Sequence, residues 1–343
     1  MTPPVPKPVE LTDLEQLLDE ARGLIDARVV CSVRSGAEDF PVYAISFGSE
    51  EPSCPAVGFF GGIHGLERIG AEVVLAYLRS LVRRLRWDDV LGRKLESLRL
   101  VFMPVVNPGG LARGTRANPN GVDLMRNAPV DAREPVPFLV GGQRLSATLP
   151  WYRGARDRPM EAESQAVCDV VERELLSRPF SLAIDCHSGF GARDRIWFPY
   201  AHTAAPIPHL AEIHALKEIF EQSHIHHDYT FEPQSLQYLA HGDLWDYLYA
   251  KSLVVPEHTF LPMTLEMGSW LWVKKNPRQL FSRHGIFNPL IRHRQERVLR
   301  RHLAWLGFLP RAASSYRRWL PAGPERERHR QAALDLWYRR PTR

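Results

Sequence analysis

Short apolar segments of strand length alternate with amphipathic helical patterns along most of this chain. Residues 56–60, 98–106 and 180–186 are predominantly apolar runs, and residues 69–85 repeat apolar side chains at helical spacing. Strands that are apolar along their whole length are typical of sheets covered on both faces. We therefore expect an α/β fold, with a mixed, mostly parallel twisted sheet of about eight strands and helices on both faces.

Other segments extend this alternation. Thr12-Asp13-Leu14-Glu15 resembles a capping box and predicts a helix that runs to about residue 26. Residues 27–34 and 41–47 are rich in strand-forming side chains on either side of a polar turn, so they predict a hairpin. We also expect helices over residues 160–176, 209–223 and 243–250 and strands near 195–199, 228–231 and 253–266.

The composition indicates a soluble globular protein. The chain has 343 residues, of which 44% are hydrophobic and 24% charged. It contains no apolar stretch of about eighteen residues, the length that crosses a bilayer, and its start does not resemble a secretory signal. Its four cysteines are scattered without the C-x-x-C spacing of a zinc or redox site. We expect buried free thiols and a cytoplasmic protein, with no membrane partner.

Positive charge is concentrated at the C-terminus. Residues 291–343 contain 14 arginines and 4 acidic residues, a net charge of +10, so the rest of the chain carries about −5 of the total +5. Such a segment can bind nucleic acid or an acidic partner. Apolar side chains interleave with the arginines, namely Trp305, Leu306, Phe308, Trp319 and Leu320. This interleaving favours an arginine-rich helix packed on the body of the protein over a nucleic-acid-binding arm.

Three side chains at or near strand ends have the types that bind a metal ion. His64 and Glu67 follow the apolar run 56–60, and His187 follows the run 180–186. A His-x-x-Glu pair alone also fits a solvated loop. However, the carboxyl ends of parallel strands share one edge of a sheet, where ligands bind. Two histidines and one glutamate are among the standard ligand sets of catalytic zinc, but His187 alone also fits a strand-end histidine with satisfied hydrogen bonds.

Three further residues carry charge that catalysis or binding can use. Glu266 is an isolated carboxylate in an otherwise apolar segment, and burial of such a group without a partner is costly. Arg116 and Arg126 lie on a polar loop, where a guanidinium can bind a carboxylate or polarise a carbonyl.

These residues together resemble the zinc metallocarboxypeptidases related to pancreatic carboxypeptidase. The resemblance covers about residues 40–270. It rests on the ordered set His64-x-x-Glu67, Gly121-x-Asp123-Leu124-x-Arg126-Asn127, His187-Ser188 and Glu266. Glu67 precedes His187 by 120 residues and His187 precedes Glu266 by 79, as the family layout requires. Residues 160–166 also look like the acidic helix start of bacterial members.

The resemblance implies a role for each matching residue. His64, Glu67 and His187 would bind one zinc ion per chain, and Glu266 would act as the general base and acid. Arg116 would polarise the scissile carbonyl, Arg126 would pair with the terminal carboxylate of the substrate, and Asn127 belongs to the same binding segment. For the tyrosine that closes over the substrate in this family we expect Tyr247, with Tyr249 as the alternative.

The reaction so implied is hydrolysis of an amide bond in a small peptide by a zinc-activated water molecule. One departure bears on the substrate: the family usually has asparagine where this chain has Met125, and methionine cannot donate a hydrogen bond to a carboxylate. An N-acyl amino acid deacylase, similar to aspartoacylase and succinylglutamate desuccinylase, fits these residues as well. So does an inactive relative that only binds a carboxylate ligand.

The sequence divides into three parts on this basis. Residues 1–26 form an N-terminal extension and helix, residues 27–290 a zinc carboxypeptidase-like catalytic domain, and residues 291–343 the basic C-terminal helical extension. The expected partners are a small peptide or an acylated amino acid, and the oligomeric state is open.

Overall fold

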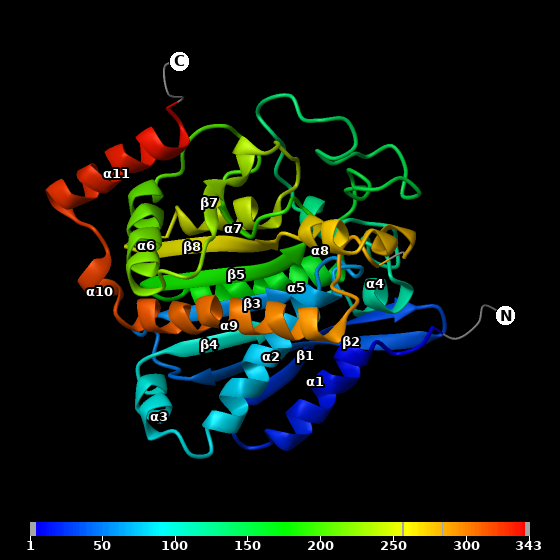
Figure 1. Cartoon of the computed structure of the whole chain (residues 1–343), viewed down its shortest axis with the longest axis horizontal. Helices are drawn as coiled ribbons and strands as arrows, with labels where there is room; N and C mark the ends of the chain where they lie inside the picture. The colour runs from blue at the N-terminus through cyan, green and yellow to red at the C-terminus, as the bar shows by residue number, and fades with distance from the viewer. Residues whose placement is uncertain (1–4, 256, 283, 340–343) are drawn as a thin grey trace.

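An eight-stranded sheet forms the centre of the protein (Figure 1). The computed structural model describes residues 5–339 except 256 and 283. The strands are β1 (Asp26–Ser35), β2 (Glu38–Gly48), β3 (Ala56–Gly61), β4 (Arg99–Met103), β5 (Phe180–Ser188), β6 (Arg195–Phe198), β7 (Thr230–Pro233) and β8 (Thr259–Met267). Every residue of β3, β4 and β5 is buried, as the apolar runs predicted.

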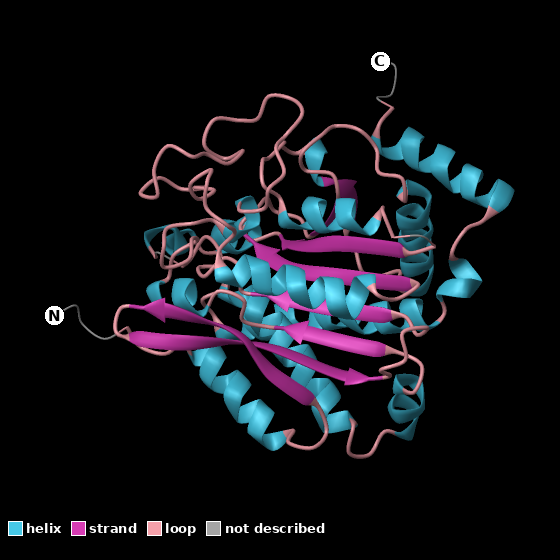
Figure 2. Ribbon diagram, turned by 180° about the vertical axis from the view of Figure 1, so that it is seen from behind, coloured by secondary structure: helices cyan, strands magenta, loops and turns pink. Residues whose placement is uncertain are grey.

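The strands lie in the order β1-β2-β4-β3-β5-β8-β6-β7. Four neighbouring pairs are parallel and three, at β1/β2, β2/β4 and β6/β8, are antiparallel. The sheet twists strongly toward the β1–β2 hairpin, as the view from behind shows (Figure 2). The expected mixed, mostly parallel twisted sheet of eight strands and the expected hairpin are thus confirmed.

Helices cover both faces of the sheet. Their bounds are α1 (Val9–Glu20), α2 (Arg68–Arg84), α3 (Asp89–Leu95), α4 (Pro108–Arg113), α5 (Ala162–Val171), α6 (Leu210–Ser223), α7 (Leu244–Ser252), α8 (Trp270–Lys275), α9 (Arg292–Ser314), α10 (Tyr316–Trp319) and α11 (Gly323–Trp337). Helices α2 and α9 pack on β3 and β5 at the front in Figure 1, whereas α5 and α7 lie behind the sheet.

Two expected boundaries are wrong. Helix α1 begins at Val9 and ends at Glu20, because Pro8 stands at its N-cap and the left-handed Gly23 follows its end. Thr12 is therefore inside the helix, where its hydroxyl donates to the carbonyl oxygen of Pro8 at 3.2 Å. At β8, the strand begins only at Thr259, because a turn at Leu253 and Val254 follows the end of α7 at Ser252.

The arginine-rich C-terminal segment packs on the body, as its interleaved apolar residues predicted. Trp305, Leu306 and Phe308 of α9 are buried in the same hydrophobic core as the strands. Within the described residues, no helix is long and apolar enough to cross a membrane. None of the four cysteines forms a disulfide, and Cys168 and Cys186 are buried, whereas Cys31 and Cys54 are only half-buried.

Candidate metal centre and substrate cavity

The candidate site lies at the carboxyl ends of β3, β5 and β8. The chain leaves β3 through Gly61 and Gly62, and His64 and Glu67 follow before α2 begins. Close packing of α2 against β5 holds this turn in place, because a Cβ atom at Gly70 would lie 2.1 Å from the carbonyl oxygen of Cys186. The turn therefore meets the end of β5, which carries His187.

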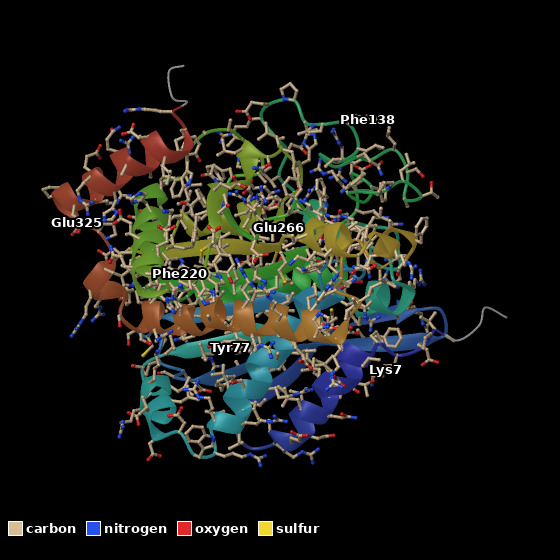
Figure 3. All side chains as sticks on the ribbon, in the orientation of Figure 1. Lys7, Tyr77, Phe138, Phe220, Glu266 and Glu325 are labelled. Atoms are coloured by element: carbon tan, nitrogen blue, oxygen red, sulfur yellow. The ribbon has the colours of Figure 1, made fainter. Side chains whose placement is uncertain are left out.

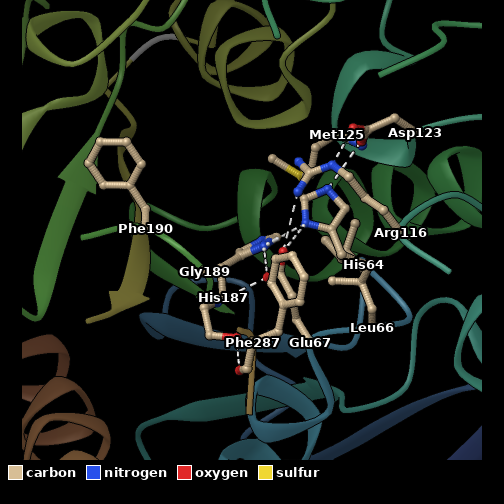
Figure 4. A network of polar contacts seen from close by, with 12 residues as sticks. His64, Leu66, Glu67, Arg116, Asp123, Met125, His187, Gly189, Phe190 and Phe287 are labelled. Carbon is tan, nitrogen blue, oxygen red and sulfur yellow. Dashed lines mark hydrogen bonds and ion pairs between the residues drawn. The ribbon is translucent and has the colours of Figure 1, made fainter. Parts of the chain in front are cut away.

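His64, Glu67 and His187 converge on one point, as the sequence predicted (Figure 4). Nδ1 of His64 lies 2.9 Å from Oε1 of Glu67, and Nδ1 of His187 lies 3.1 Å from Oε2 of the same carboxylate. The two Nδ1 atoms are 3.2 Å apart. All three side chains are buried, and one atom of each lies within 4.8 Å of the others. Such a set of three could hold a metal ion.

The other ring nitrogen of each histidine faces a buried carboxylate. Nε2 of His64 lies 3.1 Å from Oδ1 of Asp123, and Nε2 of His187 lies 2.6 Å from Oδ2 of Asp185. An aspartate in this position fixes the proton on Nε2 and leaves Nδ1 unprotonated, as metal ligation requires. The donor set and its orientation therefore fit a zinc ion.

The charges around this point favour a cation. Burial alone would raise the pKa of Glu67, but the neighbouring His64 and His187 hold it below the usual value of a glutamate. Burial opposes ionisation of Asp123 as well, yet Arg116 and His64 keep its pKa well below the ordinary range. Anionic carboxylates thus surround the two imidazoles, and a divalent cation between the Nδ1 atoms would offset their charge.

Glu266 stands beside the proposed ligands on the neighbouring strand. It pairs with His187 in the parallel register of β5 and β8, and its Oε1 accepts a hydrogen bond from the backbone N–H of Phe190 at 3.0 Å. Burial and the charge of Glu67 raise its pKa to about 8. A carboxyl group with its pKa near neutrality can both accept and donate a proton.

The two predicted arginines reach the same cavity from the loop before α5. Arg116 donates from Nε to Oδ2 of Asp123 at 2.8 Å and from a terminal nitrogen to Oε1 of Glu67 at 3.3 Å. Arg126 is buried and donates to the carbonyl oxygen of Met125 at 3.2 Å and to the hydroxyl of Tyr238 at 3.3 Å. Its Nε makes no hydrogen bond within the described residues. Part of the Arg126 guanidinium is therefore left for a ligand.

A cavity of about 740 Å³ joins these residues. His64, Glu67, His187, Arg116, Arg126 and Glu266 all line it. Its other walls are mostly apolar or aromatic and include Met125, Val140, Trp151, Phe190, Trp197, Tyr238, Trp270, Ile286 and Phe287. Asp243 is a polar exception, a buried carboxylate that caps α7 through Oδ1 and whose Oδ2 has no partner among the described residues. A cavity of this size and lining suits an organic molecule with a few fixed polar groups.

Comparison with known proteins agrees with this geometry. The family model for zinc carboxypeptidases matches residues 15–269. The chain belongs to the zinc carboxypeptidase family. The family and fold class expected from the sequence are confirmed.

Two curated members show how much of the chain is shared. Carboxypeptidase E of Caenorhabditis elegans is 29% identical over 175 residues, which are 46% of this chain and 36% of that protein. The catalytic chain of human carboxypeptidase N is 31% identical over 117 residues, 29% of this chain and 26% of that protein. The chain therefore spans about a third or less of the length of these zinc carboxypeptidases.

Solved structures share the fold at low identity. Bovine thrombin-activatable fibrinolysis inhibitor, in complex with tick carboxypeptidase inhibitor, has a TM-score of 0.63 and 19% identity, with 90% of this chain and 98% of that chain covered. Carboxypeptidase A from Helicoverpa armigera has a TM-score of 0.56 and 18% identity, with 85% and 71% covered. At these identities the likeness shows the fold alone.

The two tyrosines expected to close over the substrate, Tyr247 and Tyr249, do not line the cavity. Tyr247 lies on α7 outside the residues that line the cavity, and the Lys251 ammonium lies 4.9 Å from its ring centre. Tyr249 is fully buried, with its hydroxyl 2.9 Å from Nδ1 of His209. Tyr238, before α7, lines the cavity instead and contacts Arg126. The structure thus brings neither Tyr247 nor Tyr249 to the cavity, whereas Tyr238 in the loop before α7 lies there.

Asn127, expected to bind substrate, is likewise not among the residues that line the cavity. Its Nδ2 donates to the carbonyl oxygen of Arg153 at 2.9 Å, and its Oδ1 accepts from the backbone N–H of Glu161 at 2.6 Å. Asn127 therefore holds two loops together behind Arg126.

Sequence reasoning assigned no role to Asp123, Asp185, Tyr238 or Asn288. Asn288 accepts from the backbone N–H of Ile69 at 3.0 Å and donates to the carbonyl oxygen of Leu66 at 2.8 Å, so it fixes the turn that carries Glu67. The two aspartates carried a signal in the sequence, because each is a charged residue in a buried segment. Asp123 lies three positions before Arg126, and Asp185 lies two positions before His187. Nothing in the local sequence marks Tyr238 or Asn288.

Proposed function

We propose that this protein is a zinc-dependent metallocarboxypeptidase that hydrolyses an amide bond in small peptides. The observation that carries the proposal is the convergence of His64, Glu67 and His187, with Nδ1 of both histidines toward one point, at the wall of a cavity that also holds Glu266. Family membership supports the reaction class. Because the matched relatives are much longer than the shared region, their activity and substrates reach this chain only as part of the proposal.

Zinc held by His64, Glu67 and His187 would supply Lewis-acid polarisation and a more acidic water molecule at neutral pH. Glu266 would then handle protons. Its carboxylate would take a proton from the attacking water and deliver it to the nitrogen of the departing amine. Burial and the charge of Glu67 raise the pKa of this group to about 8, and a cation held by the neighbouring ligands would favour the carboxylate form that accepts the proton.

The arginines would bind the charged parts of the substrate. Arg116 is held by Asp123 and Glu67, so its guanidinium can support negative charge that develops on the carbonyl oxygen without first having to reorient. Arg126 has an unpartnered Nε and would pair with a substrate carboxylate. Tyr238, which contacts Arg126, would close the same end of the cavity.

Met125 bears on the choice between peptides and acylated amino acids. Its side chain lines the cavity beside Arg126, where the family usually offers an amide donor. Arg126 would therefore bind a substrate carboxylate without the amide hydrogen bond that the neighbouring residue offers in other members. We rank C-terminal trimming of peptides first, because the rest of the ligand and arginine set is complete, and deacylation of N-acyl amino acids remains an outcome of the test.

A matched substrate panel tests the proposal. Purified protein is treated with a chelator, restored with zinc, and assayed on one peptide series with free or amidated C-termini and on N-acetyl and N-succinyl amino acids. We expect hydrolysis of free-acid peptides that the chelator abolishes and zinc restores, with the amidated series slower by about tenfold or more. Hydrolysis of acylated amino acids alone would favour the deacylase. No zinc-dependent hydrolysis in either series would overturn the proposal.

A further inference from the structure

A second group of metal-binding side chains lies between α6 and α11, away from the proposed catalytic site. His214 and Glu218 come from α6 and His329 from α11, and one donor atom of each lies within 4.8 Å of the others. Figure 3 shows α11, with Glu325 labelled, at the outer edge of the molecule, whereas Glu266 lies near its middle. The two groups therefore do not share a cavity or a ligand.

The imidazole rings of His214 and His329 face each other through their Nδ1 atoms. Nδ1 of His214 lies 2.9 Å from Nδ1 of His329, and the two residues are only 6% and 5% exposed. Two tetrahedral zinc–nitrogen bonds of about 2.0–2.1 Å would separate such atoms by roughly 3.3 Å. A shift of a few tenths of an ångström between the helices would thus admit a metal ion between them.

Glu218 completes a three-donor set. It stands four residues after His214, so both side chains lie on one face of α6. Its Oε1 lies 3.7 Å from Nδ1 of His214 and its Oε2 lies 3.9 Å from Nδ1 of His329. The carboxylate is part-exposed, with a side-chain exposure of 37%, which leaves room for a water molecule as a fourth ligand.

The outer contacts of His329 fit a ligating imidazole. Its Nε2 lies 4.0 Å from Oε1 of Glu325, one helical turn earlier, a carboxylate that can accept the Nε2 proton of a metal-bound ring. Without a metal, a terminal nitrogen of Arg328 lies 2.9 Å from the same Nε2 and donates a hydrogen bond to it. The same guanidinium lies 3.5 Å from Glu325, so it can keep this ion pair when it leaves Nε2. One small change of partner therefore converts His329 from acceptor to donor at Nε2.

We propose that His214, Glu218 and His329 form a second zinc-class metal site that fastens the C-terminal helix α11 to α6. This ion adds to the one expected between His64, Glu67 and His187. Its role is structural, because no residue of the group lines the catalytic cavity. Metal binding here would stabilise the docked position of α11.

Zinc stoichiometry tests the site, with the full chain dialysed against a low, buffered zinc concentration. We expect each of His329→Gln and Glu218→Gln to bind one zinc ion fewer than the unaltered chain. Glu218→Gln alters a part-exposed side chain, so it remains informative if His329→Gln fails to fold. The matched control is His226→Gln, an exposed histidine in the connector after α6, which should leave the number unchanged.

The loss of one ion, rather than the total number, is the deciding result. If the catalytic site proved not to bind zinc, the unaltered chain would bind one ion and both variants none, and the second site would still stand. An equal number in the unaltered chain and both variants would overturn it and leave His214 and His329 joined by an N–H···N hydrogen bond alone. We also expect zinc to slow backbone amide exchange in α11 of the unaltered chain but not of Glu218→Gln; equal slowing in both would contradict the proposal.

Discussion

Oδ1 of Asp123 lies 3.1 Å from Nε2 of His64, while its other carboxylate oxygen accepts a hydrogen bond from Arg116 at 2.8 Å. One buried carboxylate thus orients a proposed metal ligand and a proposed catalytic arginine together. The two functions are coupled through a side chain that itself contacts neither the metal position nor the substrate.

Asp123→Asn tests this coupling. An amide cannot hold the proton on Nε2 of His64 as firmly, so we expect zinc affinity to fall by about 10–100-fold. Competition with a chromogenic chelator measures the affinity. Asp157→Asn, at an exposed aspartate, is the control and should bind zinc as the unaltered chain does. Unchanged affinity in Asp123→Asn would mean that the carboxylate does not orient the ligand.

Met125→Asn should improve recognition of a terminal carboxylate. Met125 lines the cavity and is 5% exposed, and an amide in its place adds a donor beside Arg126. One hydrogen bond to a charged group is worth enough to lower KM for free-acid peptides by about tenfold. Met125→Leu should leave KM unchanged. A similar effect of Met125→Asn on amidated peptides would show that the carboxylate does not lie there.

Tyr238→Phe should impair the enzyme while Tyr247→Phe does not. Only Tyr238 lines the cavity and shares a hydrogen bond with Arg126, so loss of its hydroxyl should lower kcat/KM by about three- to tenfold. Steady-state kinetics of the two variants on one peptide measures the difference. A loss of activity in Tyr247→Phe alone would instead assign substrate closure to Tyr247, as expected from the sequence.

Tyr238 also shows where sequence reasoning reaches its limit. The proposed ligands and Glu266 could be singled out because each is a polar residue near a strand end or within an apolar strand, and because their order resembles that of the zinc carboxypeptidases. Tyr238 lies in the loop after β7, and its place in the cavity depends on how that loop folds back over Arg126. No local periodicity encodes such a contact.

The same distinction applies to the fold. Apolar runs located β3, β4 and β5 closely, because every residue of these strands is buried. The start of α1 was misplaced because Thr12 has the residue type of a cap, but Pro8 and Gly23 set the helix ends. Asn288 fixes the turn of Glu67 from 221 residues away, a distance over which sequence pattern carries no signal.

His302 should make stability depend on pH below neutrality. His302 is 1% exposed, and its Nδ1 lies 2.9 Å from the Tyr229 hydroxyl. Burial lowers the pKa of this histidine to about 4, although the charge of Asp194 acts in the opposite direction. Between pH 6.5 and 4 the unfolded chain binds a proton at this histidine and the folded protein does not. The stabilising contribution is therefore complete above about pH 6.5 and lost as pH falls, by up to about 1.4 kcal/mol per unit.

Urea unfolding at several pH values measures this dependence. We expect a shallower loss of stability below pH 6.5 in His302→Gln than in the unaltered chain. The exposed His293→Gln should keep the original slope. Equal slopes in all three proteins would show that His302 does not titrate differently on folding.

In the proposed reaction, zinc at His64, Glu67 and His187 works together with Glu266. Zinc content and peptide turnover, measured in one preparation of Glu266→Gln, test this cooperation. We expect the zinc content of the unaltered chain and a fall in kcat of at least about a hundredfold, because only proton transfer is removed. Full turnover in Glu266→Gln, or an unaltered chain that hydrolyses peptides without any bound metal, would contradict it.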